Sequence, residues 1–139
     1  MRILLLVFIF TLSLFGDSLG LEAKIISFIV DNISTNQEKI VFSDDTALLN
    51  KLSQTTKTTQ LCQNASIIIV KDKQHLKQEC LKKKLFVLDY DCLEKLPTSF
   101  GAFFFKKGRV NIVFIEPRLE KENIKISNKL QPYLEERIW

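Results

Sequence analysis

The sequence of 139 residues carries 20 Lys and Arg against 16 Asp and Glu, a formal net charge of +4. This excess is small and spread along the chain, whereas nucleic-acid-binding domains concentrate their cations and interleave them with exposed aromatic residues. We therefore expect no nucleic-acid partner. Four glycines and three prolines leave little room for flexible linkers, which predicts a single domain.

Residues 1–20 are typical of a secretory signal peptide. Arg2 supplies the positive start, an almost unbroken apolar run covers residues 3–15, and small residues stand at Ser18 and Gly20, where a signal peptidase would cut. A membrane-spanning helix needs roughly 20 apolar residues, more than this run provides. We therefore predict an exported, periplasmic protein whose single α/β domain occupies residues 21–139. The alternatives are an uncleaved N-terminal anchor and a buried core helix.

The first half of the domain alternates between helix and strand patterns. Apolar residues within 21–33 repeat at helical spacing, which predicts an amphipathic helix. A short strand at residues 39–42 and a helix over residues 46–52 follow, the helix with inward positions at Ala47, Leu48, Leu49 and Leu52. Residues 66–70 are apolar without alternation, the pattern of a strand that is covered on both faces.

The same alternation continues through three short elements: a helix over residues 73–80, a strand over 85–88 and a helix over 92–96. Strands that alternate with helices in this way pair in parallel. Residues 100–105 and 110–115 are strand-like runs separated by a turn in which Gly108 can adopt a positive φ. These two runs predict an antiparallel hairpin.

The segment after the hairpin is predicted to be helical. Pro117 suits the first turn of a helix that reaches Asn123, and Ser127 can cap a last helix toward Arg137. The whole pattern predicts a three-layer α/β domain, preceded by the signal-peptide helix. Its sheet is parallel in the first part and ends in the antiparallel C-terminal hairpin.

The order of elements also predicts how the three cysteines pair. Cys62 lies just before the strand at residues 66–70, and Cys80 ends the helix that returns from this strand. Both therefore belong at the same end of the sheet, whereas Cys92 follows the next strand and belongs at the opposite end. In an oxidising compartment we expect a Cys62–Cys80 disulfide and a free thiol at Cys92. Three reduced, buried cysteines are the alternative.

Carboxylates follow each of the first three predicted strands, at Asp44, Asp45, Asp72, Asp89 and Asp91. Ligands of open α/β sheets bind at the C-terminal ends of strands, so this cluster is a candidate site for a divalent cation or a cationic ligand. Each of these residues also precedes a predicted helix, where Asp is a preferred N-cap. The capping interpretation explains the cluster without a ligand.

The other ingredients of catalysis are scarce. His75 is the only histidine and lies in a segment rich in Lys and Gln, which favours a solvated residue over a general base. The sequence contains no glycine-rich phosphate loop, nucleophile elbow or paired-histidine metal motif. Three isolated cysteines and one histidine lack the short paired spacing of a zinc site. We therefore expect neither an enzyme nor a bound cofactor or metal.

Three segments near the C-terminus form a recognisable pattern. They are Gly101-Ala102-Phe103, Gly108-Arg109-Val110-Asn111-Ile112 and residues 123–130. This pattern resembles the YfiR-like family of periplasmic regulatory proteins, in which a Gly-led strand, a Gly-Arg turn and a second strand precede a closing segment of the Leu-Lys-Ile-Ser type. By order of elements the resemblance covers nearly all of residues 21–139.

The resemblance implies a regulator that contacts the outward-facing region of a membrane sensor or signalling protein, in that family a diguanylate cyclase that makes cyclic di-GMP. It is compatible with a homodimer and with a disulfide that ties activity to redox state. Membrane contact is expected only through the partner or an uncleaved leader. The alternative functions are a small solute- or metal-binding domain that uses the five aspartates, and an exported metal-dependent hydrolase at the same residues.

Overall fold

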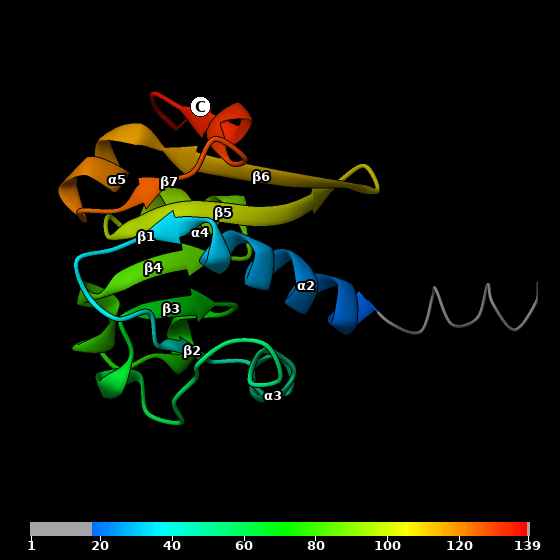
Figure 1. Cartoon of the computed structure of the whole chain (residues 1–139), viewed down its shortest axis with the longest axis vertical. Coiled ribbons are helices and arrows are strands. Elements are labelled where there is room, and N and C mark those ends of the chain that lie inside the picture. Colours follow the sequence, from blue (N-terminus) through cyan, green and yellow to red (C-terminus); the bar gives the residue numbers. More distant parts are fainter. Residues whose placement is uncertain (1–17, 139) are drawn as a thin grey trace, which may run out of the picture.

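A six-stranded sheet forms the centre of the computed structural model, which describes residues 18–138 (Figure 1). Its spatial order is β2 (Val41–Ser43), β3 (Ile67–Val70), β4 (Lys84–Val87), β5 (Ser99–Lys106), β6 (Arg109–Ile115) and β8 (Leu134–Glu135). Strands β2 to β5 pair in parallel, β5 and β6 form an antiparallel hairpin, and β8 pairs in parallel with β6. The apolar run at residues 3–15 and Trp139 lie outside the described residues.

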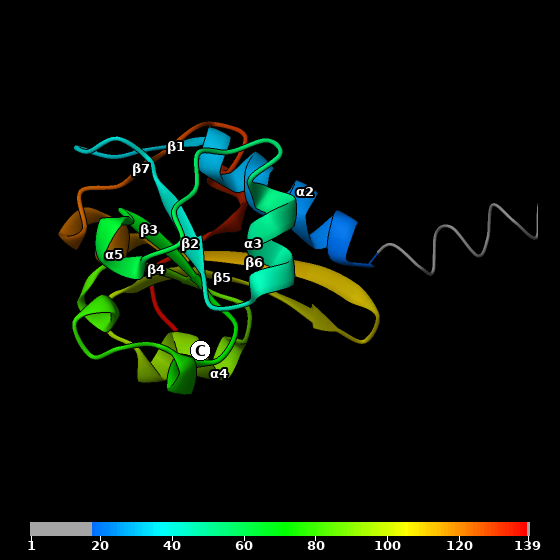
Figure 2. The ribbon, with the colours of Figure 1, turned by 90° about the horizontal axis from the view of Figure 1, so that it is seen from below.

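Helices cover both faces of this sheet. They are α2 (Ser18–Asp31), α3 (Thr46–Leu52), α4 (Tyr90–Lys95) and α5 (Glu116–Lys121). On one face Ile26 of α2 and Leu48 of α3 share a hydrophobic cluster with Ile67 of β3. On the other face Leu93 of α4 shares a second cluster with Ile68, and Figure 2 shows α4 across the sheet from α2 and α3. The predicted three-layer α/β fold with its partly parallel sheet and C-terminal hairpin is confirmed.

Helix α2 follows the predicted apolar stripe but begins earlier than residue 21. It starts at Ser18, and the half-buried Leu19 packs against the core. At its other end Lys39 donates hydrogen bonds from Nζ to the carbonyls of Val30 and Ile33, at 2.7 and 2.9 Å. The predicted cleavage point after Gly20 therefore falls inside this helix. None of the helices in the described residues is long and apolar enough to cross a membrane.

Helix α3 has the bounds that the sequence predicts. Asp45 is its N-cap, and Leu48, Leu49 and Leu52 are buried as expected. Ala47 is exposed, contrary to the prediction that it points inward. The short antiparallel pair of β1 (Ile33–Ser34) and β7 (Lys125–Ile126) was not predicted, because two-residue strands leave no periodic pattern.

The predicted helix over residues 73–80 is wrong. The segment contains two 3₁₀ turns instead, η2 (Lys73–His75) and the start of η3 (Cys80–Lys82). Only Leu76 among residues 73–79 is apolar, so a helix here would have no apolar face to bury. Helices this short are not stable without such packing.

The predicted last helix from Ser127 toward Arg137 is also wrong. The chain forms a 3₁₀ turn, η4 (Gln131–Tyr133), and then strand β8. Pro132 explains the difference, because it lacks the N–H that the interior of the predicted helix would need. The segment therefore extends the sheet along β6.

Three aromatic rings pack closely around Gly101 in the centre of the sheet. Phe86, Phe100 and Phe114 are buried, with ring centroids 5.7 to 6.4 Å apart. Gly101 pairs with Phe86 on one side and Phe114 on the other. A Cβ at Gly101 would lie 2.7 Å from the carbonyl oxygen of Val113 and 2.8 Å from the Phe114 ring. Only glycine fits at this position.

We expect Gly101→Ala to lower the free energy of unfolding by about 1–3 kcal/mol, the usual cost of overpacking a core. The matched control is Gly108→Asn, because Gly108 has φ +74° but open space around it, and Asn tolerates this backbone region. Urea denaturation of both variants is the measurement. An unfolding midpoint of Gly101→Ala equal to that of the unsubstituted protein would contradict this packing.

Candidate functional site

The predicted carboxylate cluster lines a cavity of about 740 Å³ at the C-terminal ends of β2, β3 and β4. The structure brings all five aspartates together there: Asp44, Asp45, Asp72, Asp89 and Asp91. Cationic and neutral side chains share the wall, among them Lys71, Lys73, His75, Cys92 and Lys95. The cavity is therefore of mixed charge and open to polar ligands.

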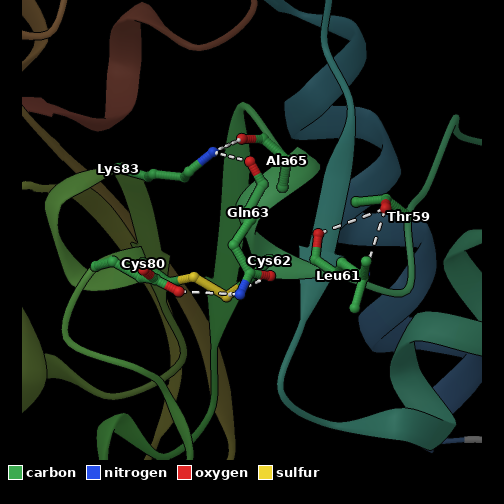
Figure 3. Close-up of a disulfide and its surroundings, with 8 residues drawn as sticks. Thr59, Leu61, Cys62, Gln63, Ala65, Cys80 and Lys83 are labelled. Carbon is green, nitrogen blue, oxygen red and sulfur yellow. Dashed lines mark hydrogen bonds between the residues drawn. A yellow bond between two sulfur atoms is a disulfide. The ribbon is translucent and has the colours of Figure 1, made fainter.

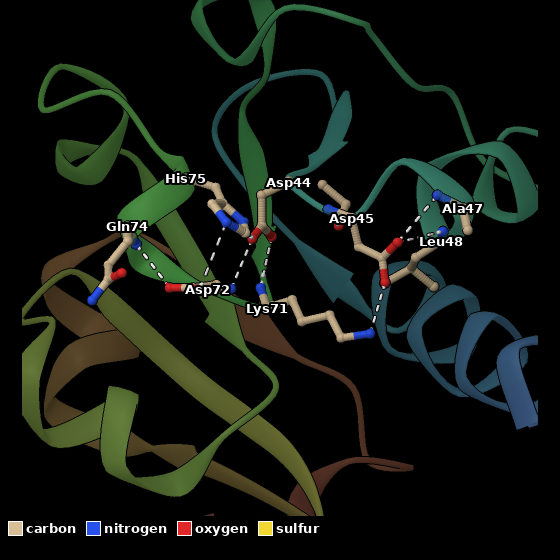
Figure 4. Close-up of polar contacts among 9 residues, drawn as sticks. Asp44, Asp45, Ala47, Leu48, Lys71, Asp72, Gln74 and His75 are labelled. Carbon is tan, nitrogen blue, oxygen red and sulfur yellow. Dashed lines mark hydrogen bonds and ion pairs between the residues drawn. The ribbon is translucent and has the colours of Figure 1, made fainter.

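Asp44 connects the ends of two strands. Its side chain is only 2 % exposed and accepts hydrogen bonds from the backbone N–H groups of Lys71 and Asp72, both at 2.7 Å. His75 lies beside it, with Nδ1 3.8 Å from Oδ2 of Asp44 and Nε2 3.8 Å from Oδ2 of Asp72 (Figure 4). Asp44 thus holds the loop after β3 against the end of β2.

Asp45 combines an N-cap with an ion pair. It accepts hydrogen bonds from the N–H groups of Ala47 and Leu48 at 3.1 and 3.3 Å, and Nζ of Lys71 lies 3.0 Å from its Oδ2. Partial burial opposes ionisation of Asp45, but the hydrogen bonds from Lys71, Leu48 and Ala47 outweigh it, so the pKa of Asp45 is lowered. The same hydrogen bond to Asp45 raises the pKa of Lys71.

Two other aspartates are also caps. Asp72 accepts a hydrogen bond from the N–H of Gln74 at the start of η2, and Asp89 accepts one from the N–H of Asp91 at the start of α4. Asp91 lies in the first turn of α4. The capping interpretation therefore describes Asp45, Asp72 and Asp89, whereas Asp44 bridges two loops. Residues 18–138 contain no group of three or more His, Cys, Asp or Glu side chains placed to hold a metal ion.

Cys92 contributes a free, half-buried thiol to the cavity. Burial, with the nearby negative charge of Asp89, raises the pKa of this thiol. A protonated thiol is a weak nucleophile.

The predicted Cys62–Cys80 disulfide is present. Cys62 lies in η1 (Cys62–Asn64), directly before β3, and Cys80 begins η3, directly before β4, with 6.0 Å between their Cα atoms. The pairing was predicted from the return of a helix, but two 3₁₀ turns carry Cys80 back to this edge instead. Lys83 supports the same region, because its Nζ donates to the carbonyls of Gln63 and Ala65 (Figure 3).

Lys71 and Arg118 were not among the residues predicted from the sequence to have a role. Lys71 directly follows the fully buried β3 and precedes Asp72, a position that could have identified it as a counter-charge for the aspartates. Arg118 donates from Nη1 to the carbonyls of Leu96 and Ser99 and to Oγ of Ser99, and burial lowers the pKa of its guanidinium. No local sequence pattern predicts this contact, because it joins segments that are far apart in the chain.

Comparison with known proteins adds no relative to this description. No protein-family model matches the sequence, and no curated protein is significantly similar to it.

We expect the disulfide to contribute about 3 kcal/mol to the free energy of unfolding, the usual value for a loop of this length. The measurement is urea denaturation of a Cys92→Ala variant with and without reductant, because this variant cannot exchange disulfides. The control carries Cys62→Ala and Cys80→Ala as well and should not respond to reductant. Equal stability of the oxidised and reduced forms would show that the bond has no structural role.

Asp45→Asn isolates the ion pair with Lys71, since Asn is as good an N-cap as Asp. The folded-state pKa of Asp45 lies below its ordinary value of 3.8, so its charge stabilises the fold above this pH and the contribution is lost as the pH falls through the lowered pKa. We therefore expect Asp45→Asn to unfold more easily at neutral pH, and the difference to vanish in acid. Asp89→Asn is the control, a cap with no ion pair among the described residues. A difference that is independent of pH would contradict the assignment.

Proposed function

We propose that the protein is an exported regulator of the YfiR-like type that acts by protein–protein contact on the outward-facing part of a membrane signalling protein, a diguanylate cyclase or similar sensor. The observation that carries this proposal is that the residues shared with the YfiR-like pattern have definite structural roles in this fold. Gly101 admits three packed rings, Gly108 adopts a positive φ in the hairpin turn, and Ile124 and Leu130 are buried. The similar residues are those that this fold requires.

The disulfide supports export to an oxidising compartment. Disulfides persist in the periplasm and are reduced in most cytoplasms. Cys62 and Cys80 are both buried in the second hydrophobic cluster. The apolar run at residues 3–15 precedes the described domain in the sequence and has the length and flanking residues of a leader.

The state of the cavity supports a binding function rather than catalysis. Three of its aspartates accept hydrogen bonds at caps, and Asp44 holds two loops together. The one thiol has a raised pKa. These groups have roles in stabilising the fold, which favours the proposal of a binding function.

The decisive experiment measures cyclic di-GMP in the source organism after deletion of the gene. We expect the level to change and to be restored by the full chain, or by residues 21–139 behind an unrelated cleavable signal peptide. Residues 21–139 without a leader should not restore it, because the partner's sensor region faces outward. An unchanged level after deletion, or complementation by the leaderless chain, would overturn the proposal.

A second candidate is a small solute-binding domain that uses the cavity beside β2, β3 and β4. The volume of about 740 Å³ and the mixed charge of its wall favour this function, since small-molecule sites are concave and carry a few convergent polar groups. A solute-binding domain would bind a polar metabolite whether or not a signalling protein is present. Asp91→Asn changes the charge of the wall without removing a side-chain hydrogen bond of the described structure. Weaker binding of a polar metabolite by this variant would favour the solute-binding function, whereas the regulatory function predicts no such binding.

A further inference from the structure

The β5–β6 hairpin extends well beyond the rest of the sheet. Strand β4 ends at Val87, which pairs with Ala102, and β5 continues for four more residues to Lys106. On the other side, β8 pairs only with Phe114 and Ile115 of β6. At about 3.3 Å per residue, the free part of the hairpin is about 13 Å long. Figures 1 and 2 both show it projecting past the other strands.

Apolar and cationic side chains are exposed together on this projecting tip. Phe105 and Val110 form a cross-strand pair and are 54 % and 40 % exposed. The Phe105 ring packs edge-on against the buried Phe103, with centroids 5.3 Å apart. The turn adds three exposed cations, Lys106, Lys107 and Arg109, and residues 99–115 contain no Asp or Glu.

We propose that this hairpin tip docks on an anionic membrane surface. Clustered Lys and Arg are attracted to anionic lipid headgroups, while adjacent Phe and aliphatic side chains insert into the interfacial region. A protein partner would need about 800 Å² on each side for a stable interface, whereas the free part of the hairpin is two strands wide and about 13 Å long. The size and the charge of the tip therefore match a lipid surface better than an acidic protein.

The position of α2 supports an orientation in which the hairpin tip faces the membrane. Both views place the start of α2 at the same end of the molecule as the hairpin turn (Figures 1 and 2). Near this start Leu21 is 47 % exposed and Lys24 is exposed. In the sequence the apolar residues 3–15, which lie outside the described residues, precede this helix. An uncleaved leader would bring this end to the bilayer, and cleavage would add the positive charge of a new amino group at the same end.

The aspartates of the cavity do not oppose the contact. It lies at the C-terminal ends of β2, β3 and β4, behind the hairpin, which overhangs β4 by about 13 Å. Electrostatic interactions in physiological salt are screened over about 8 Å. Repulsion between the aspartates and lipid phosphates is therefore weak when the tip touches the surface. The proposal goes beyond the regulatory function and does not depend on the identity of a protein partner.

The test measures binding of the protein, purified as cells export it, to vesicles of phosphatidylglycerol and phosphatidylcholine in equal parts. Bound protein is separated by sedimentation of the vesicles. Lys106→Gln, Lys107→Gln and Arg109→Gln together should weaken binding by roughly 100-fold, since each cation near an anionic surface contributes about five-fold. The matched control neutralises three exposed lysines outside the hairpin, Lys82, Lys121 and Lys125, and should bind as the unsubstituted protein does. Equal losses in the two triple variants, or binding that is equally strong to pure phosphatidylcholine, would overturn the proposal.

Fluorescence locates the contact without relying on the leader. A Phe105→Trp variant that also carries Trp139→Phe holds one tryptophan, at the tip. Its emission should shift to shorter wavelength when the anionic vesicles are added, while a tryptophan at the exposed Tyr133 in the same background should not respond. No shift at Phe105 would exclude insertion of the tip. Dimers that dissociate in a Phe105→Ser variant, without vesicle binding, would instead assign the tip to a second copy of the chain.

Discussion

The structure depends on burying strand β3 from both sides. All four residues of Ile67–Val70 are at most 1 % exposed. Ile67 and Ile69 belong to the hydrophobic cluster under α2 and α3, whereas Ile68 and Val70 belong to the cluster under α4. A strand with apolar side chains on both faces is stable only between two covering layers. The three-layer architecture follows from this one segment.

The parallel pairing around β3 gives the sheet two chemically different edges. Residues that precede the strands gather at one edge, where Cys62 and Cys80 meet. Residues that follow the strands gather at the other edge, where the five aspartates and Lys71 line the cavity. The chain must leave each strand and enter a helix or turn there, which exposes unpaired N–H groups that carboxylates satisfy. The presence of these aspartates in the cavity therefore follows largely from the topology.

Sequence reasoning succeeded where a pattern is local or follows from topology. The uninterrupted apolar run of β3, Gly108 in the hairpin turn and the Cys62–Cys80 pairing were all predicted, and the strand order brought the five aspartates to one edge as expected. The helices predicted at residues 73–80 and 127–137 are absent, and the chain forms 3₁₀ turns there. Capping residues and polar helix formers favoured a helix in both predictions. The first segment lacks an apolar face, and the second contains Pro132. The contacts of Arg118 with Leu96 and Ser99 could not be predicted, because they depend on how distant segments pack.

The structural roles of side chains help to separate function from stability in this chain. Four of the cavity aspartates accept backbone hydrogen bonds, and Arg118 ties α5 to the segment before β5. At the hairpin tip, by contrast, Phe105 and Val110 are exposed side by side, and the cations beside them have no ion pair among the described residues. Exposed apolar side chains rimmed by charge mark interaction surfaces. The requirements of folding therefore explain the aspartates of the cavity. They do not explain the exposed residues of the tip, which we attribute to binding.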